Sequence, residues 1–227
     1  MLKKILLSML VLTAVAQSGA QAANNAAPVK KPPPPPDYFP LRVNDWWKYQ
    51  STTGEGKVTK FDIKVISAEK QPDETIIYAV DTTTPNAIHD WYSKQKGQVL
   101  RHKEQYGDNA NMVVNYDPLF LFIQNPLWGK DKDGNIQTWQ WKGKGMMNVD
   151  IEENATVSGP EDVFVPAGKF SCMKVSNHVK QGGAEMVKTF WFANWVGLIK
   201  SSTQSGPVGS VTELMDWSFK PKPKPSK

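Results

Sequence analysis

Cysteine and histidine are scarce in this chain of 227 residues. Cys172 is the single cysteine, so no disulfide can form within the chain, and the three histidines are His89, His102 and His178. A zinc site needs about three or four converging ligands, and no histidine here has a partner ligand at helical spacing. We therefore predict no metal site, a domain held by its apolar core, and Cys172 buried as a small apolar residue.

A long apolar run is also missing after the first residues. Residues 5–16 form a mainly apolar run that follows Lys3 and Lys4 and precedes Ala20-Gln21-Ala22. This layout is typical of a secretory signal peptide (residues 1–22) cleaved after Ala22; an uncleaved anchor is the alternative, but a membrane span needs about 20 apolar residues. We expect a periplasmic protein, or alternatively a secreted one, with no transmembrane segment after cleavage. The cleavage site has no nearby cysteine, which excludes a lipoprotein anchor there.

Catalytic sequence motifs are absent as well. The chain contains no Gly-x-Ser-x-Gly elbow, no Gly-Lys-Ser/Thr phosphate loop and no Gly-x-Gly-x-x-Gly. Residues 131–135 resemble the start of a calcium loop, but the twelfth position holds Lys142 instead of an acid. Asp133-Gly134 is therefore interpreted as a hairpin turn. We expect no cofactor and no enzymatic activity; an envelope hydrolase using carboxylates or His178 is the less favoured alternative.

Proline and lysine are concentrated at the two ends. Residues 23–36 form a linker with five consecutive prolines, which favour an extended polyproline II conformation. Residues 220–227 alternate lysine with proline and form a basic tail, which could make weak contact with an anionic surface. Because the excess positive charge lies in these tails, nucleic-acid binding is not expected. Residues 37–219 are left as one domain.

Alternating polar and apolar residues dominate that domain and predict strands. The expected strands are residues 46–52, 60–65, 75–81, 88–93, 98–104, 136–141, 148–152, 163–166, 170–178, 187–192, 197–203 and 211–219. One short helix is expected at residues 119–124, because Asp117-Pro118 resembles a helix start. The fold class is therefore mainly β, a strongly curved antiparallel sheet (barrel or half-barrel) with at most one or two short helices.

Large aromatic side chains exceed what one sheet face can bury. The chain has nine tryptophans and nine phenylalanines. Trp139 and Trp141 share one strand face, as do Phe190 and Phe192. With Trp91, these residues are the candidate lining of a concavity that binds an apolar or lipid-like small molecule. The alternative is a structural or assembly module that binds another envelope protein through a sheet edge or the basic tail.

Three segments resemble a known family. Residues 37–49 resemble its opening "PLxVGxxWxY", residues 163–175 its "VxVPAGxFxCxKV" hairpin, and residues 190–200 its "WYAxGVGLVK" strand pair. This TapB-like family comprises exported bacterial β-rich domains of unknown function, so the resemblance implies a β fold and an envelope location, without catalytic residues. Asn44 replaces the usual glycine, and asparagine tolerates a positive φ, so we expect the turn to be kept.

Overall fold

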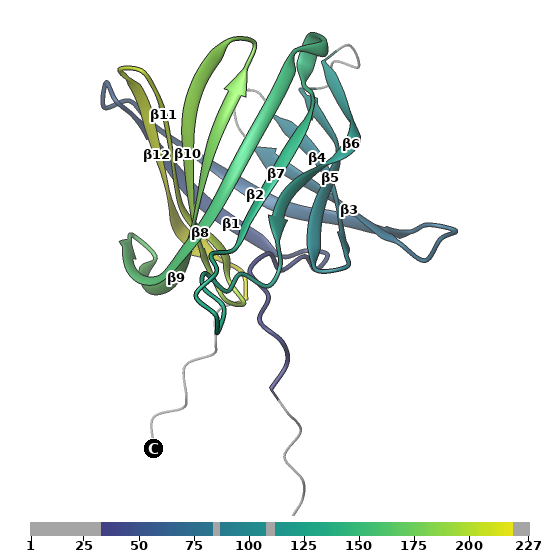
Figure 1. The fold of residues 1–227 in the computed structure, drawn as a ribbon, viewed down its shortest axis with the longest axis horizontal. Helices are drawn as coiled ribbons and strands as arrows, with labels where there is room; N and C mark the ends of the chain where they lie inside the picture. Colours follow the sequence, from purple (N-terminus) through teal and green to yellow (C-terminus); the bar gives the residue numbers. More distant parts are fainter. Residues whose placement is uncertain (1–32, 84–86, 108–111, 220–227) are drawn as a thin grey trace, which may run out of the picture. The chain divides into compact units, whose positions relative to one another are not determined.

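Antiparallel strands form almost all of the regular structure in the computed structural model, which describes residues 33–83, 87–107 and 112–219 (Figure 1). The described residues from 35 onward form one compact unit. Ala22 and the signal segment, most of the linker, and the tail 220–227 lie outside the described residues. The strands are β1 (Trp46–Thr53), β2 (Val58–Lys70), β3 (Ile76–Thr83), β4 (Ile88–Gln95), β5 (Gln98–Tyr106), β6 (Val113–Gln124), β7 (Thr138–Lys144), β8 (Asp150–Val165), β9 (Gly168–Gln181), β10 (Ala184–Ala193), β11 (Gly197–Ser205) and β12 (Val208–Trp217).

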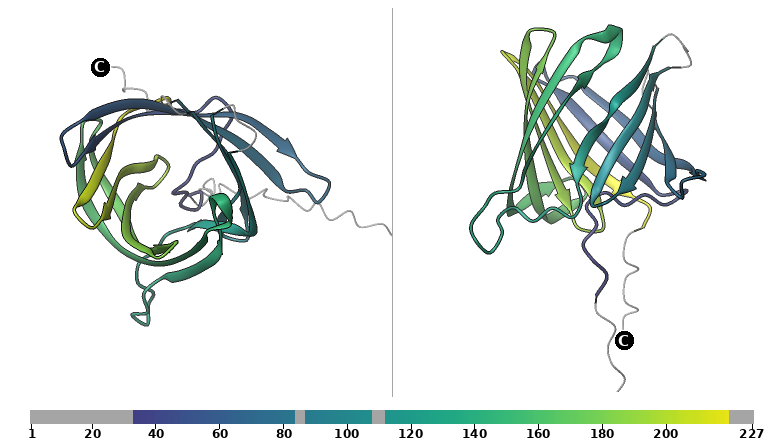
Figure 2. Two further views of the ribbon diagram at one scale, coloured as in Figure 1. Left: turned by 90° about the horizontal axis from the view of Figure 1, so that it is seen from above. Right: turned by 45° about the vertical axis from the view of Figure 1, so that its right-hand side comes forward.

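The strands form one 12-stranded sheet in the order β6-β5-β4-β3-β2-β1-β12-β11-β10-β9-β8-β7. Each strand pairs antiparallel with its neighbour, and β1 pairs with β12. The sheet curls until its edge strands β6 and β7 contact each other, as the view from above shows (Figure 2, left). The expected strongly curved antiparallel sheet is thus confirmed, as an almost closed barrel.

The two ends of this barrel differ. At one end, which we call the base, the segment 37–45 enters and packs against the sheet: the ring of Phe39 lies 5.2 Å from that of Tyr92 and 5.3 Å from that of Phe122. The connections β1–β2, β7–β8, β9–β10 and β11–β12 all lie at the other end, the mouth, because successive strands run antiparallel (Figure 1). The base is therefore closed by the chain's own N-terminal segment.

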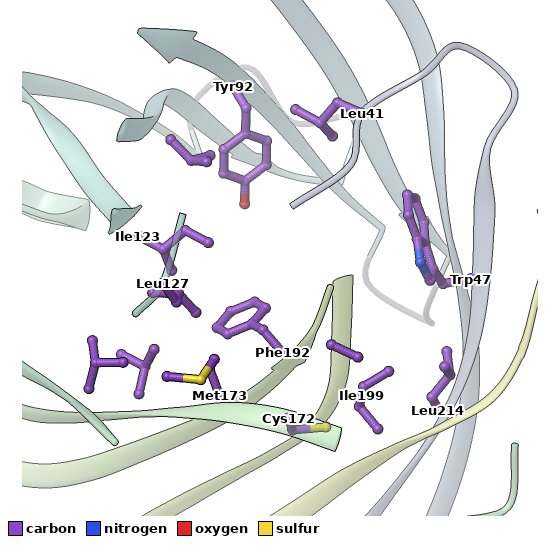
Figure 3. Packing of buried hydrophobic residues seen from close by; sticks show 14 of the residues in the cluster. Leu41, Trp47, Tyr92, Ile123, Leu127, Cys172, Met173, Phe192, Ile199 and Leu214 are labelled. Carbon is purple, nitrogen blue, oxygen red and sulfur yellow. The ribbon is translucent and has the colours of Figure 1, made fainter. Parts of the chain in front are cut away.

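The core lies inside the curl, toward the base (Figure 3). Val65, Phe192, Ile199 and Leu214 come from four different strands, β2, β10, β11 and β12, and are completely buried. Cys172 is buried among them as predicted, and this burial raises the pKa of its thiol to about 12. Strands contribute alternate residues to this interior, which is why the period of two in the sequence identified most of them.

The expected helix at residues 119–124 is wrong. These residues belong to β6, where Phe120 pairs with Arg101 and Ile123 with Val99 of β5. A short apolar run can satisfy its backbone in either structure, and here β5 supplies the ladder. Pro118 is tolerated because β6 is an edge strand, where a missing N–H costs no ladder bond. The helical structure in the described residues is the 3-10 turn η1 (Met146–Asn148).

Two further expectations concern local geometry. The segments 148–152 and 163–166 are not separate strands but parts of the long strand β8, whose register shifts between Ser158 and Glu161. Asn44 has a φ of 75°, so it does replace glycine in a left-handed turn. The turn is fixed to β2, because the Asn44 N–H donates to the carbonyl oxygen of Val65 at 2.9 Å.

Candidate functional site

The predicted lining residues do not all reach the interior. Trp91 pairs with Ala79 on β3 and Lys103 on β5, on the face opposite to buried Tyr92. The Lys103 ammonium lies 4.2 Å from the centre of the Trp91 ring, and this pairing takes place on the outer surface. Trp91 therefore does not line the concavity, because a side chain next to an inward-facing residue on a strand points outward.

The other four candidates face inward but have different surroundings. Phe192 and Trp139 belong to the main core, whereas Trp141 packs against Tyr116 and Phe120 in a smaller cluster between β6 and β7. Phe190 is only partly buried; its ring lies 6.1 Å from that of Phe192 and 6.0 Å from that of Phe122. Of the predicted set, Phe190 is the one at the border between core and mouth. A ligand-binding role for these residues stays a prediction.

A small apolar cavity lies in the base. It measures about 90 Å³ and is lined by Phe39, Pro40, Leu41, Trp47, Tyr49, Ile63, Val80, Phe122, Gly197 and Leu198. None of the predicted lining residues borders it. Typical small-molecule sites measure about 300–1,000 Å³, so this cavity is a packing defect of the core and too small for a lipid-like molecule.

Charged side chains also lie inside the barrel, on the wall formed by β4 and β5. Arg101 lies between two carboxylates: its Nε is 3.2 Å from Asp90 Oδ1, and its Nη1 donates to Glu104 Oε2 at 3.1 Å. Nε and Nη2 both donate to the Tyr92 hydroxyl, at 3.0 and 2.7 Å. The guanidinium also stacks on the rings of Tyr92, Phe120 and Phe122. We call Asp90, Arg101 and Glu104 the arginine cluster.

The pKa values of the two carboxylates in the arginine cluster are shifted in opposite directions. Asp90 is 7% exposed, and burial raises its pKa to about 6 against the lowering influence of Arg101. Burial also raises the pKa of Glu104, but Arg101 and the hydroxyls of Tyr116 and Tyr106 outweigh this and hold it below its usual range. Tyr116 donates to Glu104 Oε2 at 2.7 Å and Tyr106 to Oε1 at 2.9 Å. Glu104 therefore stays ionised beside Arg101.

A second polar group lies on the opposite wall. Lys188 on β10 donates to Glu153 Oε1 on β8 at 3.3 Å, and Asn177 on β9 donates to Glu153 Oε2 at 3.0 Å. The positive charge of Lys188 also helps to lower the pKa of Glu104. The two polar groups thus act on each other across the interior, above the apolar core.

Sequence reasoning missed both groups. The sequence pattern does not reveal the arginine cluster, because the register between β5 and β6 shifts between Arg101 and Lys103. Simple alternation therefore places charged side chains of β5 on the wrong face of the sheet. Lys188 and Glu153 are 35 residues apart, and only strand pairing brings them together.

The hydrolase alternative named carboxylates or His178, and the structure brings together two carboxylates, Asp90 and Glu104 beside Arg101, but not His178. His178 is exposed and pairs with Asn154 and Val187 on the outer face, because its neighbour Asn177 points inward. It therefore cannot act with the arginine cluster. Within residues 33–83, 87–107 and 112–219, no group of His, Cys, Asp and Glu side chains could hold a metal ion. In the same residues, no helix is long and apolar enough to cross a membrane.

Comparison with known proteins finds a family model that matches part of the chain and solved structures of similar fold. Residues 124–214, which include β7 to β11, match the model of a family described as DUF3108-like. This range contains the segments 163–175 and 190–200 but not the segment 37–49. The more specific TapB-like name stays a prediction. No curated protein matches the chain.

Solved structures resemble the chain over most of its length. A candidate exported protein with a YmcC-like fold from Bacteroides fragilis is 20% identical, with a TM-score of 0.51, covering 81% of this chain and 100% of that one. A candidate lipoprotein from Parabacteroides distasonis is 14% identical, with a TM-score of 0.52, covering 82% and 100%. The hypothetical lipoprotein YmcC of Escherichia coli aligns with a TM-score of 0.34 and 16% identity, covering 80% and 86%. The first two likenesses show a shared fold.

Proposed function

We propose that this chain is an exported, non-enzymatic binding module of the bacterial cell envelope, whose interior takes an apolar or lipid-like ligand through the mouth. One observation carries the proposal. Along a single strand, the inward-facing residues change from apolar and buried near the base to polar and partly exposed near the mouth. On β1, Trp47 and Tyr49 are buried at the base, whereas Ser51, next on the same face, is only partly buried. Solvent therefore reaches the inner wall of the barrel from the mouth at the height of Ser51.

Half-buried aromatic rings mark where the apolar core meets this accessible part. Phe61 on β2 stacks on Tyr49 at 5.6 Å, and Phe190 on β10 stacks on Phe192 at 6.1 Å. Both rings are partly buried, so each keeps apolar surface toward the mouth. Covering such surface with an alkyl chain contributes about 25 cal/mol per Å², which favours a ligand with an apolar part.

The envelope location is supported by the signal-like residues 1–22 and by the descriptions of the two structures of similar fold, one as an exported protein and one as a lipoprotein. An assembly role through a sheet edge receives less support. Both edges, β6 and β7, face each other at the seam, and residues 116–119 bulge out of the β5–β6 ladder around Pro118. Bulges and prolines at edges hinder the addition of a further strand.

Native mass spectrometry of the protein purified from an envelope extract tests the proposal. We expect a species heavier than the mature chain that returns to the chain mass after denaturation, with an extractable lipid-like compound. A protein that carries no compound, and that also fails to bind any added single-chain amphiphile in titration calorimetry, would contradict the binding role. Fractionation of the cell tests the envelope location independently.

A further inference from the structure

Hydroxyl side chains form two rows on the inner wall near the mouth. In the first row, Ser201 on β11 pairs with Thr212 on β12, Thr212 with Ser51 on β1, and Ser51 with Thr59 on β2. In the second, Thr203 pairs with Ser210, and Ser210 with Thr53. Directly opposed residues on neighbouring antiparallel strands share a face. We call these residues the hydroxyl rows.

The hydroxyl rows face the interior, because the same strand faces carry the core at the base. Below them, Leu214 pairs with Tyr49, which pairs with Phe61; Leu214 is 0% and Tyr49 3% exposed. Side chains two residues apart on a strand point to the same side of the sheet, so the residues of the first row lie on the same inner face as Leu214, Tyr49 and Phe61. Each strand thus changes from apolar to hydroxyl-bearing at the same height, across four adjacent strands.

These hydroxyls are available to a ligand. Thr53 accepts the N–H of Lys57 at 3.3 Å. Within the described residues, the hydroxyls of the other members make no hydrogen bond to protein, and all of these members are only partly buried. A hydroxyl can both donate and accept, so each member of the rows can serve as a donor or as an acceptor.

The rows themselves contain no charged side chain, but a lysine lies at each end of the second row. Lys188 lies opposite Thr203 and is paired with Glu153, and Lys57 lies opposite Thr53, to which its backbone is hydrogen-bonded. The first row has uncharged partners across the strands, so an ionised head group placed there would lose its hydration without gaining a counter-charge, which is unfavourable. An uncharged polyhydroxyl group exchanges its hydrogen bonds to water for hydrogen bonds to the rows at little cost.

We propose that the hydroxyl rows bind the uncharged, polyhydroxylated head group of a glycolipid-like amphiphile. The inference rests on the proposed binding function and specifies its ligand class. The alkyl part of the ligand packs against Phe61 and Phe190, which border the rows: Phe61 lies two residues from Thr59 on the same strand face, and Phe190 pairs with Ser201. The apolar and polar parts of the wall thus match the two parts of one molecule.

Titration calorimetry with three ligands that share one alkyl chain tests this assignment: dodecyl maltoside, dodecylamine and dodecanoate, each below its micelle concentration, with maltose as the chain-free control. We expect dodecyl maltoside to bind most tightly and maltose not to bind measurably. Thr212→Val and Thr203→Val remove a hydroxyl and keep the shape, so each should weaken dodecyl maltoside binding about three- to tenfold and leave dodecanoate binding unchanged.

Thr52→Val is the matched control, because Thr52 lies on the outer face of β1 between Ser51 and Thr53 and pairs with Val58 and Val211. It should bind all ligands as the unmodified protein does, and thermal melting confirms that each variant folds. Equal affinity for the three amphiphiles, maltose binding as tight as that of dodecyl maltoside, or no effect of the inner substitutions would overturn the assignment. Failure of all three amphiphiles to bind would instead overturn the binding function itself.

Discussion

The indole N–H of Trp141 on β7 donates to the carbonyl oxygen of Leu119 on β6 at 3.0 Å, and this bond joins the two edge strands of the sheet. The ring also packs edge-on against Phe120 at 4.7 Å and against Tyr116 at 5.8 Å. No ladder connects β6 and β7 in the described residues. Side-chain contacts therefore hold the two strands together at this seam, whereas backbone hydrogen bonds join neighbouring strands in the rest of the sheet.

Replacing Trp141 tests how much the seam contributes to stability. Trp141→Phe keeps an aromatic ring but removes the N–H, so we expect the free energy of unfolding to fall by about 1–3 kcal/mol. Trp141→Ala also leaves a cavity and should cost about 3–5 kcal/mol. Urea unfolding followed by circular dichroism measures both values.

Trp128→Phe is the control for the Trp141 variants, because Trp128 is 44% exposed in the β6–β7 connection. It should change the free energy of unfolding by less than about 0.5 kcal/mol. Equal effects of the Trp128 and Trp141 substitutions would show that the seam does not depend on the indole.

Asp90 should make stability depend on pH. Burial raises its pKa from 3.8 to about 6 in the folded protein, so between these values the folded state holds the proton more tightly than the unfolded state. Ionisation of Asp90 therefore lowers the free energy of unfolding as pH rises through this window, and this decrease is complete above about pH 6. In Asp90→Asn this loss is absent. Relative to the unmodified protein, the variant should gain on the order of 2 kcal/mol in free energy of unfolding between about pH 4 and pH 7.

Chemical unfolding at several pH values measures the gain. Glu104 acts in the opposite sense, because its lowered pKa contributes stability that is lost as pH falls, but this contribution is common to both proteins. Asp62→Asn is the matched control, since the Asp62 side chain is 49% exposed beside Lys48. A difference between Asp90→Asn and the unmodified protein that stays constant with pH would contradict the expected titration of Asp90.

Cys172 should be unreactive in the folded protein. Its side chain is 0% exposed, and burial raises its pKa to about 12, so almost no thiolate exists near neutral pH. We expect a thiol reagent such as iodoacetamide to modify the protein only after denaturation, as mass spectrometry would show. Rapid modification without unfolding would indicate that the core opens at β9.

Much of the fold could be predicted because its signals are local. Alternation identified nearly all strands, and the expected turn Asp133-Gly134 lies in a loop closed by a hydrogen bond from the Asp131 N–H to the Asn135 carbonyl oxygen. Asn44 adopts the left-handed conformation that its position in the opening motif predicted. Each of these features depends on a residue and its immediate neighbours, so one sequence contains the information.

The candidate site could be predicted only in part. Alternation placed Phe190 and Phe192 on one face but could not show that Trp91 points outward. Of the predicted lining residues, Phe190 lies at the border between the core and the mouth. The arginine cluster depends on a register shift in β5, and such shifts leave no distinct pattern in the sequence.

The sequence by itself determined most of the strands, the turns between them and the burial of large aromatic side chains in a β domain. The tertiary structure alone decided that residues 119–124 become an edge strand, that Trp141 closes the seam, and that Ser51 meets Thr212, 161 residues away, in one hydroxyl row. The physical reason is that strand formation follows local side-chain alternation, whereas the partner and the register of each strand minimise the free energy of the whole sheet.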